Sequence, residues 1–228
     1  MKWNVFYKAF ITNEGYIDVL IGLRNTIIIA VAGLVLGIII GTLIAIVKVI
    51  PKENNIPLKI LDKVGSVYVA FFRGTPIVVQ LLIVYFLVMP AGVSGIIVGI
   101  LVFGMNSGAY VSEIMRAGIL SVDKGQTESG RSLGLNYRQT MIKIVLPQAF
   151  KNILPTLGNE FISLIKETSV LTFIAVVDLT KAFNSIASSN YEYTIPYLTL
   201  AAIYLVLVLG IAYLVKILER RMRRSDKR

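Results

Sequence analysis

Cysteine and histidine are both absent from this chain of 228 residues. Their absence excludes disulfide frameworks, cysteine nucleophiles, histidine bases and the usual ligands of a zinc site, so we expect no metal. Charged residues are scarce, at 16% of the sequence, against about 25% in soluble domains. With 56% hydrophobic residues and a mean hydropathy of +0.75, the composition excludes a soluble enzyme and a disordered chain.

Apolar runs predict an all-α integral membrane protein with five core transmembrane helices. The first run, 26–47, contains no charge and can cross a hydrocarbon core of about 30 Å. The second reaches spanning length only if its helix begins near Val64, continues to Met89 and carries Arg73 inside it. The others are 95–115, the more polar 153–165, and 197–215. The run 168–177 is too short to cross and is expected to be re-entrant or interfacial.

Positive charges predict how these spans are oriented. Most of the 23 Lys and Arg residues fall in the segments 48–63, 116–143 and 216–228, which alternate with loops that carry few of them. Cytoplasmic loops carry such an excess, so we expect the N-terminus outside and the C-terminus in the cytoplasm. The net charge of +10 then indicates sidedness and contact with membrane lipid, not binding to nucleic acid.

This orientation divides the chain into three parts. Residues 1–19 are expected to form an extracytoplasmic segment, 20–218 the transmembrane domain, and 219–228 a basic cytoplasmic tail. The domain includes a long cytoplasmic loop at about 120–147.

The cytoplasmic loop is predicted to contain two short helices. The first covers 122–133 and ends at Gly134, because glycine favours the position just after a helix. Asn136 and Gln139 have the spacing of a capping pair that starts the second helix. Pro147 lies where a further helix can begin. Since loops carry function more often than spans do, this helical pair is a candidate functional element.

The same loop resembles the EAA loop of ABC importer permeases. The matching positions are Glu128, Ser129, Gly130, Gly134, Ile144, Leu146 and Pro147. Ser129 and Gly130 stand where two alanines are usual, but they keep the small size. Further motifs resemble the polar amino acid branch of that family: Arg73-Gly74-Thr75-Pro76 with Gln80, 110–113 with 116–119, 158–161, and 166–169. The resemblance extends over about 20–218.

The resemblance implies a permease subunit with the type I importer fold, in a bacterial-type inner cell membrane. Such permeases form dimers, here expected to be homodimers, and they pair with a cytoplasmic ABC ATPase dimer. An extracytoplasmic amino acid binding protein delivers the substrate. This chain has no Gly-x4-Gly-Lys-Ser/Thr phosphate loop, so we expect it to bind no cofactor and to be no enzyme. ATP-Mg would be bound and hydrolysed by the partner.

The resemblance also implies that the loop transmits movement of the ATPase. Small residues at Ser129 and Gly130 are expected to let the loop enter a groove on the partner, and Gly134 permits the sharp turn. Glu128 is expected either to pair with a basic residue of the ATPase or to brace the loop itself.

Polar side chains on the predicted spans indicate a cavity within the membrane. On the fourth span they recur every three or four residues and share one stripe: Asn152, Thr156, Asn159, Glu160, Ser163 and Glu167. Ionisable groups at this depth cost about 2.5–3.5 kcal/mol each, which makes them functional candidates. Asn106, Tyr110 and Glu113 share a line on the third span, and Arg73 and Gln80 share a face of the second.

The predicted substrate site consists of Glu160, Asn159, Ser163, Asn106, Ser107 and Gln80. Glu160 is its centre, because a carboxylate can hold an α-ammonium or a cationic side chain. This favours arginine, lysine or histidine as substrate, with glutamine next. For Asn106, Ser107 and Gln80, hydrogen bonding between spans is an equal alternative. Arg73 is expected to snorkel, or to pair with Glu113 or Glu167.

Three glycines of the first span are spaced four apart: Gly33, Gly37 and Gly41. This spacing permits close helix packing, either within the subunit or against a partner, although glycine is common in spans.

The alternatives to an importer subunit are an independent channel or secondary carrier for small polar solutes and a membrane-embedded protease. The sequence shows no internal repeat of the kind many carriers contain, and a zinc protease without Cys or His is implausible.

Overall fold

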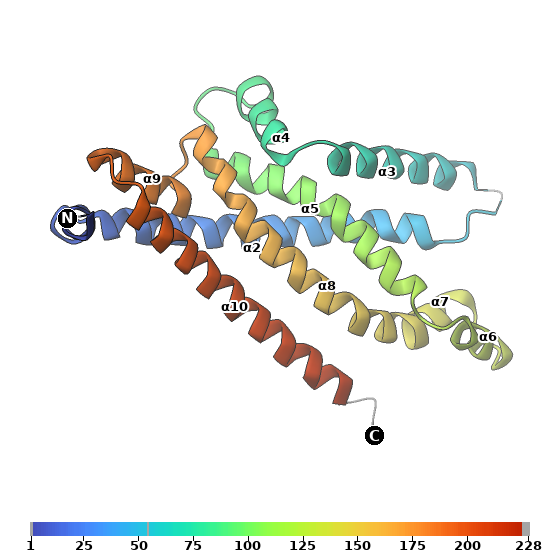
Figure 1. Ribbon diagram of the computed structural model, residues 1–228. Coiled ribbons are helices and arrows are strands. Elements are labelled where there is room, and N and C mark those ends of the chain that lie inside the picture. The colour runs from blue at the N-terminus through green and yellow to red at the C-terminus, as the bar shows by residue number, and fades with distance from the viewer. Residues whose placement is uncertain (1, 54, 225–228) are drawn as a thin grey trace.

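The computed structural model describes residues 2–53 and 55–224, and every regular element in these ranges is a helix. The long helices run roughly side by side as an elongated bundle (Figure 1). The elements are α1 (Lys2–Tyr7), η1 (Lys8–Thr12), α2 (Gly15–Val49), α3 (Ile56–Gly74), α4 (Ile77–Ile83), η2 (Val84–Val88), α5 (Gly95–Leu120), α6 (Lys124–Ser132), α7 (Tyr137–Thr140), η3 (Met141–Val145), α8 (Leu146–Glu167), η4 (Thr168–Ile174), α9 (Leu179–Asn190) and α10 (Thr194–Arg224).

Three of these helices are long and apolar enough to cross a membrane: α2, α5 and the part of α10 over Thr194–Met222. The bent pair of α3 with Ile77–Val88 would make a fourth crossing. Helix α8 has 22 residues, but because of its polar stripe it is not among the helices that are apolar enough to cross a membrane. The all-helical architecture with several apolar helices is confirmed, while the number of five spans stays a prediction.

The second predicted span is not one continuous helix, so that part of the prediction was wrong. Helix α3 ends at Gly74, and Arg73 therefore lies in its last turn rather than in mid-span. Proline disfavours helical backbone in the residue before it, and Thr75 before Pro76 has φ −121° and ψ 144°. The two helical segments on either side meet at an angle of 105°. Arg73 and Gln80 consequently do not share a helix face.

The glycine stripe of α2 packs within the subunit, against α5. A Cβ atom added to Gly37 would lie 2.8 Å from the Cβ of Ser107, and one added to Gly41 would lie 2.7 Å from the Cβ of Val111. Helix α5 contributes a glycine in return, since a Cβ on Gly104 would lie 2.5 Å from Leu36 Cδ2. The two helices thus approach closely enough to fix their register, which is the first of the two alternatives that the spacing left open.

The short apolar run 168–177 packs into the bundle core. It forms the 3₁₀ segment η4, whose Leu171 and Ile174 join a buried cluster with Ile29 and Phe103. Helix α9 follows and was not predicted. Its N-cap Asp178 is fully buried and accepts hydrogen bonds from the backbone N–H groups of the next helical turn.

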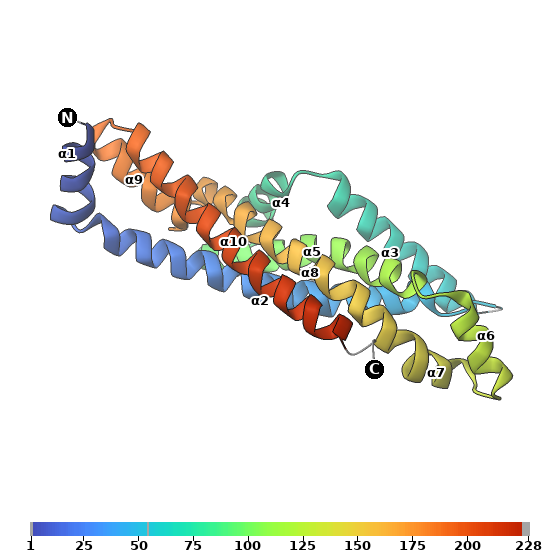
Figure 2. The ribbon, with the colours of Figure 1, turned by 60° about the horizontal axis from the view of Figure 1, so that its bottom comes forward.

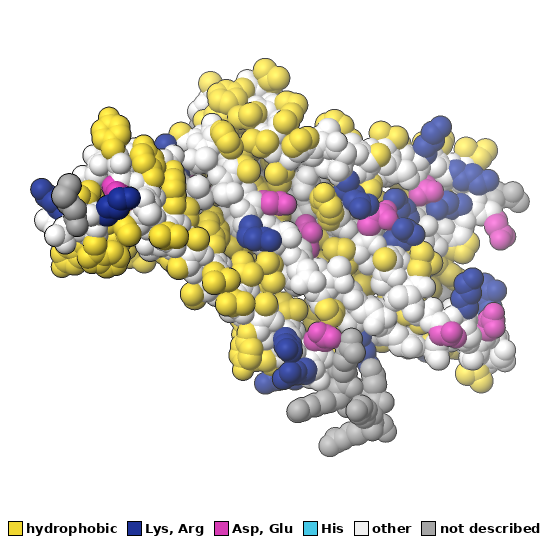
Figure 3. Space-filling model, viewed as in Figure 1, with side chains coloured by type: hydrophobic (Ala, Val, Ile, Leu, Met, Phe, Trp, Pro, Cys, Tyr) yellow, Lys and Arg dark blue, Asp and Glu magenta, His cyan; other side chains and the backbone are white. Residues whose placement is uncertain are grey.

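The two ends of the bundle differ in character. The N-terminus and α9 lie at one end, and α6 and α7 lie at the other, towards which the C-terminal end of α10 points (Figures 1 and 2). On the face in Figure 3, Lys and Arg side chains are more numerous towards the end with α6. The predicted boundary after residue 19 falls inside α2, and α10 continues to Arg224. Residues 225–228 of the predicted tail lie outside the described residues.

Candidate functional site

Helices α5 and α8 bring two residues of the predicted substrate site into direct contact. The hydroxyl of Ser107 donates a 2.8 Å hydrogen bond to Oε1 of Glu160. Ser107 is fully buried, whereas Glu160 is only partly buried. The polar stripe of α8 therefore faces α5 at this point.

Two further predicted residues support the bend between α3 and α4. The side-chain amide of Gln80 donates to the carbonyls of Phe72 and Thr75 at 2.9 and 3.0 Å. The amide of Asn106 donates to Gln80 Oε1 at 3.0 Å and to the Phe72 carbonyl at 3.2 Å. Both side chains are only 4% exposed. In this structure, Gln80 and Asn106 follow the alternative of hydrogen bonding between helices.

The remaining two predicted residues flank the carboxylate on α8. Asn159 is exposed and Ser163 is partly buried. Within the part of the chain that the structure describes, neither side chain has a hydrogen-bond partner, so both are available to a ligand. Glu160, Asn159 and Ser163 therefore form one polar surface, while Ser107 supports it from behind.

A cluster of three charges lies where α2 and α5 approach the loop end. Nζ of Lys48 lies 2.8 Å from Oε1 of Glu113, and Nη2 of Arg116 lies 2.8 Å from Oε2 of the same carboxylate. Sequence reasoning missed Lys48, because nothing in the spacing along one helix identifies a partner on another. Of the alternatives expected for Arg73, pairing with Glu113 or Glu167 is not found among the described residues, and its guanidinium lies over the ring of Tyr110, 5.3 Å from the centroid.

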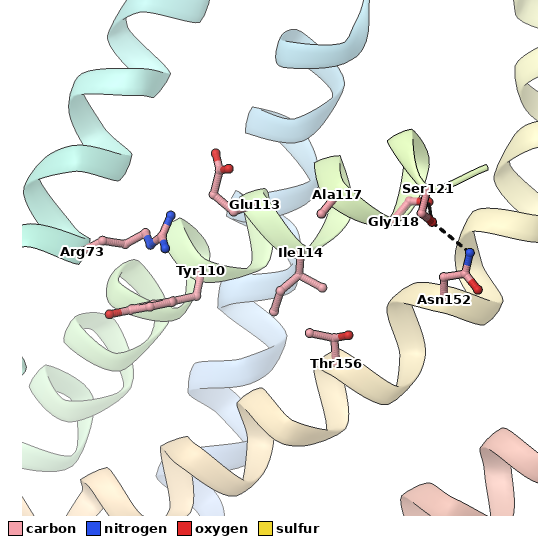
Figure 4. Close-up of a pocket in the computed structure, with 9 residues that line it drawn as sticks. All are labelled: Arg73, Tyr110, Glu113, Ile114, Ala117, Gly118, Ser121, Asn152 and Thr156. Atoms are coloured by element: carbon pink, nitrogen blue, oxygen red, sulfur yellow. Dashed lines mark hydrogen bonds between the residues drawn. The ribbon is translucent and has the colours of Figure 1, made fainter. Parts of the chain in front are cut away.

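A cavity of about 490 Å³ lies between the end of α3, α5 and α8 (Figure 4). Its lining residues are Arg73, Tyr110, Glu113, Ile114, Ala117, Gly118, Ser121, Asn152 and Thr156. The amide of Asn152 donates to the hydroxyl of Ser121 at 2.9 Å. The cavity is thus lined by Asn152 and Thr156 of the α8 stripe, which lie between Glu160 and the predicted cytoplasmic loop.

The first helix of that loop ends as predicted. Gly134 has φ +76°, a conformation that residues with a side chain rarely adopt. Its N–H donates to the carbonyl of Arg131 at 2.9 Å, and the N–H of Leu135 donates to the carbonyl of Gly130 at 3.1 Å. These two bonds form a Schellman motif, which satisfies carbonyls at the end of α6.

The second helix also starts as predicted. The N–H of Gln139 donates to Asn136 Oδ1 at 2.9 Å, and the N–H of Asn136 donates to Gln139 Oε1 at 3.1 Å, which completes a capping box. The hydroxyl of Tyr137 donates to the carbonyl of Val49 at 3.4 Å, and burial raises the pKa of this tyrosine. The loop is therefore joined to the end of α2. Pro147 lies in the first turn of α8, as expected.

Small size is required at Gly130 inside the loop itself. Gly130 is buried, and an added Cβ would lie 2.8 Å from Thr140 Cγ2 and 3.1 Å from Ile144 Cδ1. The family resemblance implied that this small size serves the fit with a partner, whereas the structure gives it a role in packing α6 against the following segment. Glu128 and Ser129 are exposed. The exposed side of the loop also includes Leu133, Leu146 and Pro147.

Known sequences resemble this chain along most of its length. The family described as "Binding-protein-dependent transport system inner membrane component" matches residues 33–224. The putative glutamine transport system permease protein GlnP of Rickettsia typhi is 38% identical over 204 residues, which is 88% of this chain and 91% of the relative. The arginine transport system permease protein ArtQ of Bacillus subtilis is 36% identical over 226 residues, which is 98% of this chain and 100% of the relative.

A solved structure agrees with these relatives. The structure described as an amino acid ABC transporter with histidines is 38% identical, with a TM-score of 0.81 over 92% of this chain and 96% of that chain. The inward-facing MetNI methionine ABC transporter shares the fold, with a TM-score of 0.71 at 16% identity, over 94% of this chain and 97% of that chain. This chain therefore belongs to the family of binding-protein-dependent transport system inner membrane components, as a permease component of an amino acid ABC importer.

Proposed function

We propose that this permease imports polar amino acids by ATP-driven alternating access, with arginine, lysine or histidine preferred and glutamine next. The observation that carries the proposal is the bond between Glu160 and Ser107 at the interface of α5 and α8. One hydroxyl bond leaves most acceptor positions of the carboxylate open to an ammonium or guanidinium group. The unbonded amide of Asn159 and hydroxyl of Ser163 can supply donors and acceptors for the rest of the substrate.

The relatives support this choice of substrate class. One of them is named for arginine transport and another for glutamine transport. A carboxylate at the centre of the site favours the cationic substrate, because charge-assisted hydrogen bonds are stronger than neutral ones. Family membership also favours an importer subunit over the alternative of an independent channel or secondary carrier.

The loop of α6 and α7 is proposed to couple transport to a cytoplasmic ATPase dimer, which would hold ATP-Mg. The carboxylate of Glu128 is exposed, and no other described residue pairs with it. This favours pairing with a basic residue of the ATPase over bracing of the loop. Ser129 is exposed beside it, and Leu133 is 78% exposed. An acidic group and an apolar group on one projecting hairpin suit a protein partner better than solvent.

Movement of the loop can reach the site through one helical segment. The backbone stays in the right-handed helical region across the junctions between α7, η3 and α8. Tyr137 and Glu160 lie on this segment, roughly 35 Å apart at 1.5 Å per residue. A push on the loop would therefore displace Glu160 relative to Ser107 on α5 and open or close the site. The complete importer would contain a second copy of this chain and an extracytoplasmic binding protein.

Reconstitution tests this proposal. The permease, its ATPase and its binding protein are placed in liposomes, and uptake and ATP hydrolysis are measured across a panel of amino acids. We expect Glu160→Gln to reduce uptake of the cationic substrate by about tenfold more than uptake of glutamine, because only the cation loses a charge-assisted bond. Glu160→Asp is the control that keeps the charge. If the Gln variant reduces uptake of both substrates by the same factor relative to the wild type, Glu160 is not part of the site.

A further inference from the structure

Arg73 is a cation that lacks an acidic partner in the described structure. It is exposed at the end of α3, where its guanidinium lies over the ring of Tyr110. Glu113, which lines the same cavity, is already paired with Lys48 and Arg116. The positive charge of Arg73 is therefore free to act on a ligand in the cavity.

The rest of the cavity suits a small zwitterion. Its volume of about 490 Å³ falls in the range of small-molecule pockets. Figure 4 shows Arg73 and Tyr110 at one end, Asn152 and Ser121 at the other, and Thr156 on the α8 wall between them. The amide nitrogen of Asn152 is used by Ser121, which leaves its carbonyl oxygen and the Thr156 hydroxyl to accept from an ammonium group.

We propose that this cavity is a second binding station for the transported amino acid, and that Arg73 binds the α-carboxylate there. The proposal rests on the proposed import of amino acids. A guanidinium offers two parallel N–H donors that match a carboxylate, and its position over the Tyr110 ring, 5.3 Å from the centroid, favours a cation there. Glu113 does not compete for Arg73, because two other cations neutralise it.

The two stations would recognise different parts of the substrate. Thr156 precedes Glu160 by one turn of α8, or about 6 Å along the helix axis, so the cavity lies next to the Glu160 site on the side of the coupling loop. Glu160 favours a cationic group, whereas Arg73 binds the carboxylate that all amino acids share. The station near the loop is therefore expected to accept arginine and glutamine alike, and to ignore an amine that lacks the carboxylate.

The second binding station can be tested by placing competing amino acids inside a vesicle. Liposomes that contain the complete transporter are preloaded with unlabelled arginine, glutamine or agmatine, which is arginine without its carboxylate. Initial uptake of labelled arginine is then measured with the binding protein outside. We expect internal arginine and glutamine to slow uptake and agmatine to have no effect. Arg73→Gln should raise the half-inhibitory concentration of internal glutamine by about tenfold, which corresponds to the loss of one charge-assisted bond.

Matched variants separate this role from a general effect. Lys63→Gln removes an exposed cation from the same helix outside the cavity, and it should leave the half-inhibitory concentration unchanged. Thr156→Val on the opposite wall should raise it, as a second variant in case Arg73→Gln does not assemble. The station is refuted if agmatine inhibits as well as arginine, or if neither cavity variant changes the inhibition. Absence of any amino acid uptake by the wild type would instead refute the proposed function.

Discussion

Substitution of Gly37 by alanine tests whether packing of α2 on α5 controls the substrate site. The new Cβ would lie 2.8 Å from both Cβ and Oγ of Ser107, which is closer than such atoms can remain. Overpacking of this kind costs about 1–3 kcal/mol, and the higher helix propensity of alanine returns about 1 kcal/mol. We therefore expect a loss of stability of about 0–2 kcal/mol.

The effect on the site should exceed this modest loss. Rotation of the Ser107 side chain moves only its Oγ, so relief of the clash with Ser107 Cβ requires α2 and α5 to move apart, and this movement disturbs the bond to Glu160. When the bond to Ser107 is lost, substrate binding must order the Glu160 side chain. This ordering costs about 0.5–1.5 kcal/mol of binding free energy for one side chain. This corresponds to a rise in KM for arginine of about two- to tenfold. The assay is the concentration dependence of uptake in liposomes, alongside thermal denaturation of the purified complex.

Two other Gly→Ala variants provide the controls. Gly33→Ala also crowds α5, since its Cβ would lie 3.0 Å from Phe103 Cβ, but it does not contact Ser107. It should leave KM unchanged, and any loss of thermal stability should be smaller than that of Gly37→Ala. Gly210→Ala on α10 has no atom within 4 Å of the new Cβ, so it should leave KM unchanged and raise stability by about 1 kcal/mol through helix propensity alone. The reasoning fails if Gly37→Ala keeps the wild-type KM, or if Gly33→Ala raises KM as much.

Three predictions concern the loop. Gly134→Trp should leave the permease in the membrane but uncouple ATP hydrolysis from uptake, because a side chain at φ +76° is strained by about 1–2 kcal/mol; Gly134→Asn, which tolerates this conformation better, should retain coupling. Gly130→Val should unfold the hairpin and speed its cleavage by trypsin, whereas Ser129→Val should leave cleavage unchanged and reduce coupling. Glu128→Gln should weaken pulldown of the ATPase, and a wild-type yield would contradict pairing with the partner.

Local signals in the sequence were sufficient for the ends of the loop helices. Gly134 and the pair Asn136 and Gln139 act through backbone atoms within a few residues, so their spacing alone defines the geometry. The stripe on α8 was predictable for the same reason, because a helical period assigns residues to a face. The assignment of Glu160 to this stripe needed no knowledge of any other helix.

The bend at Thr75 could have been predicted, since Pro76 carries the signal. The requirement for a span of sufficient length outweighed that signal and led to one continuous helix through Arg73. Helix α9 was missed for a different reason. Its start is marked by a single cap, Asp178, and it follows an apolar run that was interpreted as a separate segment.

Contacts between helices were beyond the reach of the sequence, and the pair of Ser107 and Glu160 shows why. Periodicity places Ser107 on a line of α5 and Glu160 on a line of α8, but a shift of either helix by one turn would move them about 5.4 Å apart. The interlocking of Gly37 and Gly104 with the facing helix sets the position of α5 against α2. The same close packing that the glycines allow therefore determines which polar groups can meet, and a substitution at Gly37 should affect Glu160 although no hydrogen bond joins the two residues in the described structure.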